Sequence, residues 1–86
     1  MMKSFEHVVM DPVGIHARPA GLLAKEAKQY TSSVTIKKGS MKADAKKLMQ
    51  LMGLGVKTGE KIEIEIDGKD EEVAYESLKT FFLANL

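Results

Sequence analysis

The sequence predicts an α+β fold in which helices cover an antiparallel β-sheet. Ile62, Ile64 and Ile66 alternate with acidic residues, which is the pattern of a strand with one buried face. Pro19 precedes apolar residues at helical spacing, and proline is favoured in the first turn of a helix. The turn residues 38–40 separate two further short strand-like segments. The expected order is β-α-β-β-α-β-α, for which a helix-covered antiparallel sheet is the simplest arrangement.

The first half of the chain is expected to contain a strand, a helix and a hairpin. Residues 3–10 predict a strand whose buried face the pattern leaves open, and the turn residues 11–14 end it. A helix is expected over about 17–29. Its apolar stripe consists of Ala17, Ala20, Leu23, Ala24, Ala27 and Tyr30. Strands at 34–37 and 41–43 then form the hairpin.

The second half adds two helices and the clearest strand. Asp44 is the expected N-cap of a helix over about 45–53, although the family resemblance described below starts this helix nearer Lys47. Residues 62–67 form the strand, and a last helix with an acidic first turn begins near Asp70. Its expected buried stripe consists of Val73, Ala74, Leu78, Phe81 and Phe82.

Length and composition narrow the class of protein. A chain of 86 residues predicts one small domain over 1–86. Without cysteine it has no disulfide framework and no thiolate nucleophile, which fits a reducing compartment. No stretch approaches the roughly 20 apolar residues that cross a bilayer, and no signal-peptide pattern is present. We therefore expect a soluble cytoplasmic protein without membrane insertion, and no metal or other cofactor.

The small net charge of +1 is unevenly spread along the chain. Residues 1–47 hold 9 of the 13 Lys and Arg, whereas residues 48–86 hold 8 of the 12 Asp and Glu. The basic cluster consists of Lys37, Lys38, Lys42, Lys46 and Lys47. It lacks interleaved aromatic residues, and the pI of 8.0 is below that typical of nucleic-acid-binding domains. We expect a solvated face or an acidic protein partner, and no nucleic acid.

The segment 14–20 brings a histidine, an arginine and a helix start together within one turn. A helix N-terminus carries partial positive charge and free N–H groups, here those of Ala17 and Arg18, so it attracts phosphate. The Arg18 guanidinium adds a permanent charge that binds phosphate oxygens. The neutral imidazole of His16 has a lone pair that can attack phosphorus. These residues predict an anion site with His16 as its nucleophile.

Two other residues, His7 and Asp11, are candidates for this site. His7 lies in the middle of a predicted strand, with no arginine beside it, so we expect a structural or surface residue. Asp11 either steers His16 electrostatically or serves only the turn before Pro12, and turn chemistry is the commoner role for an aspartate there.

At these residues the chain resembles the HPr family, the histidine-containing phosphocarriers of the bacterial sugar phosphotransferase system. Residues 14–20 match the signature Gly-(Ile/Leu)-His-Ala-Arg-Pro-Ala without a mismatch. Residues 48–56 look like the second helix of the family and its glycine exit. The length also agrees, so the resemblance covers essentially all 86 residues.

The resemblance implies a fold and a reaction. The fold is an open-faced β-sandwich with strand order 1-4-2-3, three helices on one face and water on the other. Phosphorylated enzyme I passes its phosphoryl group to Nδ1 of His16, and this phosphohistidine passes it to IIA domains of sugar permeases. Arg18 and the helix N-terminus neutralise the charge of the phosphate. Such a protein is a stoichiometric carrier rather than an enzyme, and we expect it to be a monomer.

A carrier that serves several partners needs a docking surface, which we place at the second helix. The resemblance favours exposure of Leu48, Met49 and Met52, and methionine adapts well to different partners. Gly21 in the first helix either leaves room for a partner side chain or has no special role. Leu51 and Leu54 are expected in the core.

One position departs from the pattern of many Gram-positive HPr proteins. Their regulatory serine begins the second helix, thirty-one residues after the histidine, and Lys47 stands at that position here. The sequence therefore contains no regulatory serine at this site. Two other functions remain open: a regulatory paralogue of the nitrogen-related branch, and a module that binds a phosphorylated ligand without covalent transfer.

Overall fold

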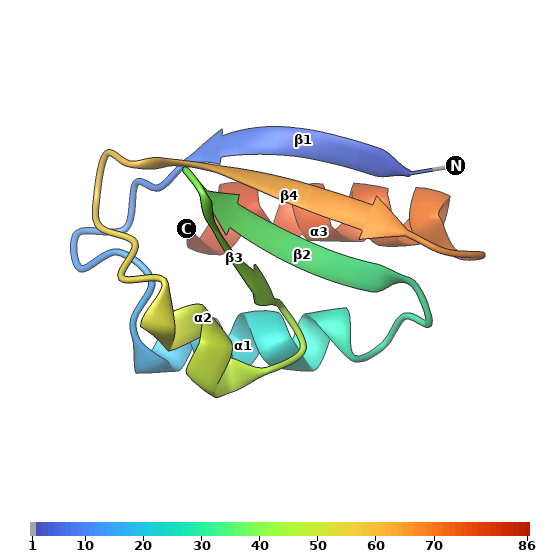
Figure 1. The fold of residues 1–86 in the computed structure, drawn as a ribbon, viewed down its shortest axis with the longest axis horizontal. Helices are drawn as coiled ribbons and strands as arrows, with labels where there is room; N and C mark the ends of the chain where they lie inside the picture. The colour runs from blue at the N-terminus through green and yellow to red at the C-terminus, as the bar shows by residue number, and fades with distance from the viewer. Residues whose placement is uncertain (1) are drawn as a thin grey trace.

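The computed structural model describes residues 2–86 and contains the seven expected elements in the expected order (Figure 1). The strands are β1 (Lys3–Val8), β2 (Ser33–Lys38), β3 (Met41–Asp44) and β4 (Lys61–Asp67). The helices are α1 (Ala17–Ala27), α2 (Leu48–Gly53) and α3 (Glu71–Asn85). Most boundaries lie within two residues of those predicted, which is the usual uncertainty of helix and strand ends.

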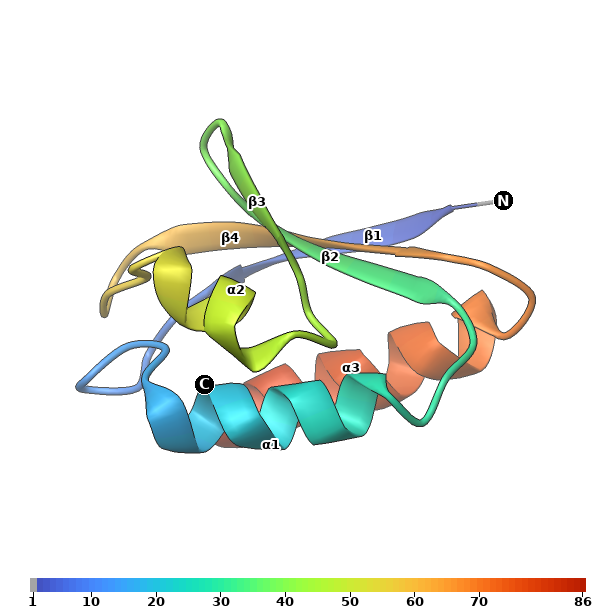
Figure 2. The same cartoon turned by 60° about the horizontal axis from the view of Figure 1, so that its bottom comes forward.

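The four strands form one antiparallel sheet in the order β1-β4-β2-β3. Figure 2 shows the three helices on the same side of this sheet, with α2 beside α1. The opposite side of the sheet is uncovered. This arrangement confirms the predicted fold class and strand order.

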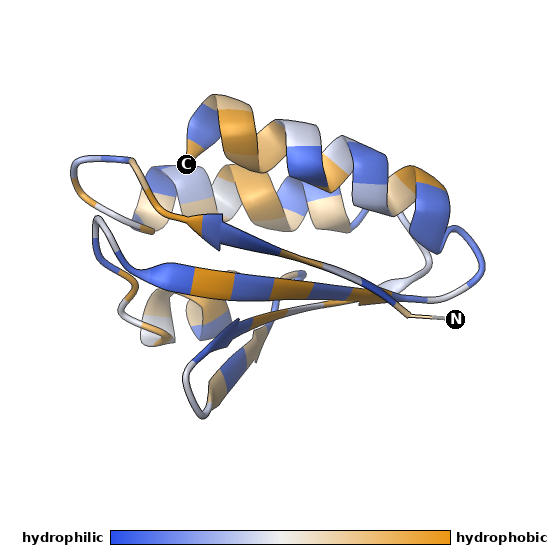
Figure 3. Cartoon of the chain, turned by 90° about the horizontal axis from the view of Figure 1, so that it is seen from above, coloured by the Kyte–Doolittle hydropathy of each residue, from blue (hydrophilic) through white to orange (hydrophobic). Residues whose placement is uncertain are grey.

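The core lies between the sheet and the helices. In β4 the side chains of Ile62, Ile64 and Ile66 are buried beneath the helices, as their alternation predicts, and bands of opposite hydropathy alternate along the strands (Figure 3). Burying an isoleucine side chain contributes about 1.5–3 kcal/mol to folding, so this strand is a main source of stability. The intervening Glu63 and Glu65 face the uncovered side and are half-buried.

Both long helices bury slightly different faces from those predicted. Val73 is 62% exposed, because the buried positions of α3 follow the four-residue spacing of Ala74, Leu78 and Phe82. Val73 precedes Ala74 by one residue and so points about 100° away from this stripe. In α1 Ala17 is exposed and Pro19 is buried in its place.

The predicted start of α2 at residue 45, with Asp44 as its N-cap, is wrong. The Ala45 N–H donates to the Val34 carbonyl at 2.8 Å, which keeps the chain paired with the sheet at this point. The Asp44 carboxylate accepts the Lys46 N–H at 2.9 Å and so closes a local turn. The helix therefore begins at Leu48, with Lys47 as its N-cap.

His7 has the structural role expected of it. It lies in β1, and its ring is 5.3 Å from the ring of Phe82 in α3. The Nε2 atom is buried and has no hydrogen-bond partner among residues 2–86. A side chain in this position helps to pack β1 against α3.

Asp70 connects the loop before β2 to the start of α3. Its carboxylate accepts the backbone N–H groups of Thr31 and Ser32, each at 2.9 Å, and the Ser32 hydroxyl. These bonds, with that of the Ser32 hydroxyl foremost, lower the pKa of Asp70 from 3.8 to about 2. The charged carboxylate is thus favoured by folding.

We expect Asp70→Asn to lower the free energy of unfolding above pH 3.8 and to matter progressively less as the pH falls toward 2. A group with a lowered pKa stabilises the fold above its unfolded value, and this stabilisation is lost as the folded state takes up the proton. Denaturant titrations across this range measure the effect. The matched control is Asp67→Asn, an exposed carboxylate. An equal gap between wild type and Asp70→Asn at every pH would contradict the role of the charge.

None of the helices in residues 2–86 is long and apolar enough to cross a bilayer.

Candidate functional site

His16 stands at the start of α1, where it is the N-cap residue with an extended backbone (φ −114°). Its carbonyl accepts the first helical hydrogen bond, from the Ala20 N–H at 2.9 Å. The imidazole makes no capping hydrogen bond, and 34% of the side chain is exposed. The ring is therefore held at the helix end and remains accessible to another molecule.

Asp11 serves the turn, which is the role the sequence favours, and its carboxylate also lies near His16. Its Oδ1 accepts the Val13 N–H at 2.9 Å, which is turn chemistry. The same oxygen lies 3.6 Å from Nε2 of His16. The carboxylate therefore places negative charge beside Nε2, while Nδ1, the other ring nitrogen, makes no hydrogen bond within residues 2–86.

A close approach of two loops fixes the position of His16. Gly14 has φ +82°, and a Cβ at this residue would lie 2.8 Å from Cα of Lys57 and closer still to the Val56 carbonyl oxygen. The Ile15 N–H donates to that oxygen at 3.0 Å. The Thr58 hydroxyl donates to the Asp11 carbonyl. Glycine is required at residue 14 because only hydrogen fits between the two loops.

The first turn of α1 offers donors to an anion. The N–H groups of Ala17 and Arg18 have no acceptor among residues 2–86, and Pro19 has no N–H. The Arg18 side chain is exposed and makes no ion pair or hydrogen bond within the described part of the chain. The structure thus leaves two amides and a guanidinium beside His16 free to bind a phosphate.

Exposed apolar side chains lie on α2, next to α1 (Figure 2). Met49 is 76% exposed, and Leu48 and Met52 are 38% and 40% exposed. Leu51 and Leu54 are buried, so the predicted division between exposed and core residues is confirmed. A Cβ at the half-buried Gly21 would meet no atom within 4 Å, so space is available there.

Comparison with known proteins connects this geometry to a family. The family model for the "PTS HPr component phosphorylation site" matches residues 3–84. The chain belongs to the HPr family. Phosphocarrier protein HPr of Mycoplasma capricolum is 40% identical over 78 residues, which cover 91% of this chain and 88% of the relative.

Solved structures of HPr proteins agree with the fold. One histidine-containing phosphocarrier protein, from work on the divergence of Mycoplasma from Gram-positive bacteria, superposes with a TM-score of 0.92 at 36% identity, covering 95% of this chain and 93% of the other. An HPr dimer of Thermoanaerobacter tengcongensis superposes with a TM-score of 0.76 at 35% identity, covering 83% and 82%. The HPr fold is therefore shown both by the sequence and by the structure.

Sequence reasoning missed part of the apolar surface of this HPr protein. Val13 and Leu22 are 66% and 44% exposed and flank the signature in the chain. The sequence contains a signal for the exposure of each of these two residues. Val13 stands in a turn, where an apolar side chain has no strand or helix to pack it, and Leu22 falls outside the helical stripe of Ala20, Leu23 and Ala24.

Lys47, at the position of the Gram-positive regulatory serine, is exposed at the N-cap of α2. The first turn of this helix contains no acidic residue. A cation at a helix N-terminus opposes the helix dipole, whereas a phosphate there is favoured. The local electrostatics therefore differ from those of a helix start that carries phosphoserine.

Proposed function

We propose that the protein accepts a phosphoryl group from phosphorylated enzyme I on Nδ1 of His16 and passes it to IIA domains of sugar permeases. The observation that carries the proposal is the accessible imidazole at the N-terminus of α1, beside the free amides of Ala17 and Arg18. Membership of the HPr family supports it. The protein then acts as a stoichiometric cytoplasmic carrier with a phosphohistidine intermediate and needs no cofactor.

The transfer is a displacement at phosphorus. The bond from phosphorus to the donor histidine nitrogen breaks as the bond to Nδ1 of His16 forms, and the donor ring keeps the electron pair. His16 carries its hydrogen on Nε2, so its ring becomes positively charged as Nδ1 bonds to phosphorus. Asp11 Oδ1, 3.6 Å from Nε2, offsets this charge and acts as a positioning residue. On the other side, Arg18 and the helix N-terminus offset the charge of the phosphoryl oxygens.

The proposal is tested by incubating the purified protein with phosphoenolpyruvate and catalytic amounts of enzyme I. We expect one covalent phosphate that is labile in acid and stable in base, as a phosphohistidine is. A module that binds phosphorylated ligands without transfer acquires no covalent label, and that result would overturn the proposal.

The second step distinguishes the two branches of the family. We expect the labelled protein to pass its phosphate to a IIA domain of a sugar permease faster than to a nitrogen-type IIA domain. The reverse order of rates would assign the protein to the regulatory branch.

Arg18→Ala is expected to slow transfer to and from His16 by about 1–3 kcal/mol of transition-state stabilisation, the scale of a charge-assisted hydrogen bond. The fold should be unaffected, because the side chain is exposed and makes no hydrogen bond or ion pair within residues 2–86. Rapid-quench measurement of the labelling rate gives the effect. Arg18→Lys is the control for charge alone and should restore part of the rate. If the transfer rates of Arg18→Ala equal those of wild type, the Arg18 side chain faces solvent and takes no part in phosphoryl transfer.

We propose that partners dock on α1 and α2 around His16, with Leu48, Met49, Met52 and Gly21 in the contact. Met49→Glu should weaken association with enzyme I and IIA domains by about tenfold or more, because a charge would be buried in an apolar contact. Its melting temperature should change little, since the side chain is 76% exposed. Affinity is measured by titration calorimetry.

Val73→Glu is the matched control for Met49→Glu. It places the same charge on an exposed apolar residue of α3. Both variants should remain folded, and only Met49→Glu should lose affinity. Equal affinities for the two variants would place the docking surface elsewhere.

We further propose that regulation by an HPr serine kinase at the start of α2 is missing, because Lys47 has no hydroxyl to accept phosphate. The lysine favours acidic partners at this position instead. We also propose that the working state is a monomer, although one HPr relative is described as a dimer.

A further inference from the structure

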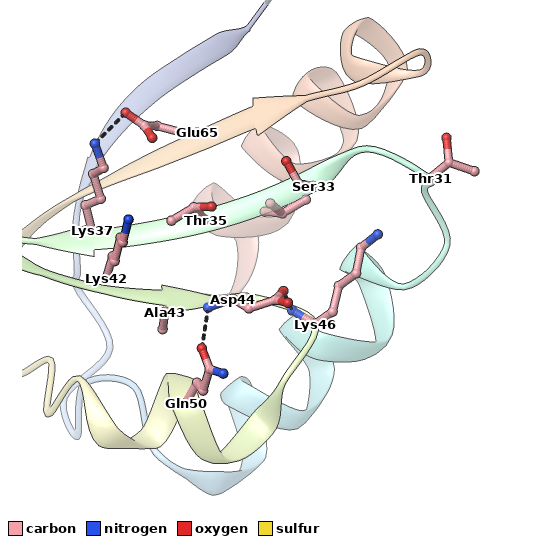
Figure 4. A pocket seen from close by; sticks show the side chains of 11 residues that line it. Thr31, Ser33, Thr35, Lys37, Lys42, Ala43, Asp44, Lys46, Gln50 and Glu65 are labelled. Carbon is pink, nitrogen blue, oxygen red and sulfur yellow. Dashed lines mark hydrogen bonds and ion pairs between the residues drawn. The ribbon is translucent and has the colours of Figure 1, made fainter.

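A polar groove of about 560 Å³ lies between the sheet and the start of α2, and Gln50 of this helix lines it. Figure 4 shows that its lining comes from β2, β3 and β4, from the segment that leads from β3 into α2, and from α2 itself. Its polar side chains include Thr31, Ser33, Thr35, Lys42, Lys46 and Gln50. The groove contains none of the residues assigned to phosphoryl transfer.

Two cations in the groove, Lys42 and Lys46, have no counter-ion among residues 2–86. Lys42 of β3 lies directly opposite Lys37 of β2 in the strand register. Lys37 is paired with Glu65, whose Oε2 is 2.9 Å from its Nζ. Lys42 makes no ion pair or hydrogen bond with another side chain in the described part of the chain. Like charges on directly opposed residues destabilise a strand pair, so the pairing of Lys42 with Lys37 is unfavourable for the hairpin.

Further donors lie around this cation. Nζ of Lys46 donates one hydrogen bond, to the Tyr30 carbonyl at 2.8 Å, and an ammonium group has three donors. Oε1 of Gln50 accepts the Asp44 N–H at 2.9 Å, which holds the amide of this side chain at the rim of the groove (Figure 4). The NH₂ group of Gln50 donates no hydrogen bond within residues 2–86. Donors from β3, from the segment before α2 and from α2 therefore line one groove.

The groove also contains an acceptor. The Asp44 carboxylate accepts one hydrogen bond, from the Lys46 N–H, and has capacity for others. A carboxylate repels a bare inorganic anion but accepts a hydrogen bond from a hydroxyl group. A ligand that satisfies the whole groove therefore has an anionic group for Lys42 and hydroxyl groups for Asp44, Thr35 and Gln50.

We propose that this groove binds a small phosphorylated polyhydroxy compound, of the sugar phosphate class, with its phosphate at Lys42 and its hydroxyl groups toward Asp44 and Thr35. The volume of about 560 Å³ lies within the range of small-molecule sites. The site is independent of His16 and does not depend on the proposed carrier function.

The test is a titration of the isotopically labelled full chain, followed by backbone amide chemical shifts. Glucose 6-phosphate is the probe, with glucose and inorganic phosphate as separate arms. We expect glucose 6-phosphate to give saturable shift changes within residues 33–46, and glucose and phosphate to give much weaker ones. Equal changes with inorganic phosphate would overturn the part played by the hydroxyl groups. Changes confined to residues 16–20 would show phosphate binding only at the start of α1 and would overturn the proposal.

Variants locate the site and separate it from phosphoryl transfer. Lys42→Gln should weaken binding of glucose 6-phosphate at least fivefold, and Lys69→Gln, an exposed lysine outside the groove, should not. Arg18→Ala should leave the changes in residues 33–46 intact, whether or not it slows phosphorylation. If Lys42→Gln binds glucose 6-phosphate with the affinity of wild type, the assignment of the phosphate to Lys42 is overturned.

The charge of Lys42 can be tested independently through the melting temperature. Lys42→Gln should raise the melting temperature of the free protein by about 1–5 °C, because it removes the opposition to Lys37. Glucose 6-phosphate in excess should stabilise wild type, and it should stabilise Lys42→Gln by a smaller amount at the same concentration. A melting temperature of the free variant at or below that of wild type would contradict the unpaired state of Lys42.

Discussion

Replacing His16 with alanine is expected to abolish acceptance of a phosphoryl group from enzyme I, to below about one part in a thousand of the wild-type rate. His16 is the residue that combines an accessible imidazole with the free amides of a helix start and a neighbouring arginine. The variant should fold, because the imidazole makes no capping hydrogen bond and is partly exposed. Acid-labile phosphate is measured after incubation with phosphoenolpyruvate and enzyme I.

His7→Leu is the matched control for this experiment. Leucine keeps an apolar side chain against Phe82, which the ring of His7 contacts at 5.3 Å, and removes the second imidazole of the chain. We expect His7→Leu to be labelled like wild type. Acid-labile phosphate on the His16→Ala protein would contradict the assignment of the phosphate to His16. Absence of the phosphate from a folded His7→Leu protein would assign it to His7 instead.

Gly14→Ala is expected to have the largest effect on stability among changes near the site, a loss of about 2–5 kcal/mol. Part of this loss is the strain of a side chain at φ +82°, about 1–2 kcal/mol. The remainder comes from the collision of the new Cβ with the backbone of Val56 and Lys57, comparable to the 1–3 kcal/mol of overpacking. The loops that hold His16 must then separate, so phosphoryl transfer should slow as well.

Gly59→Ala separates these two causes. Gly59 has a similar φ of +88°, but a Cβ there would meet no atom within 4 Å. The free energy of unfolding of Gly59→Ala should therefore fall only by the roughly 1–2 kcal/mol that backbone strain costs, and its rate of phosphoryl transfer should be unchanged. Urea denaturation gives the free energies of unfolding. A loss for Gly14→Ala no greater than that for Gly59→Ala would show that the approach of the two loops does not constrain residue 14.

Interactions between near neighbours in the chain were readable from the sequence. The alternation of Ile62, Ile64 and Ile66 established β4 and its buried face, since successive side chains of a strand point to opposite sides. Pro19 placed the start of α1, because proline fits a helix only in its first turn. The same segment gave His16 and Arg18 as the candidate site, and the resemblance gave the strand order.

The tertiary structure decided what depends on residues distant in the chain. Asp44 has the sequence of a helix cap, but the backbone pairing of β3 with β2 delays α2 to Leu48. The need for glycine at residue 14 follows from Val56, forty-two residues away, and the opposition of Lys42 to Lys37 follows from the register of the hairpin.

The physical reason is the range of the forces involved. Backbone preferences and side-chain periodicity act within one or two turns, and they determined which elements form and where His16 lies on α1. The contacts that hold the loop of His16 against Val56, expose Met49 and place Lys42 opposite Lys37 arise only when separate elements pack together. The sequence by itself therefore determined the chemistry of the candidate site, and the packing of the elements decided its exact geometry and surroundings.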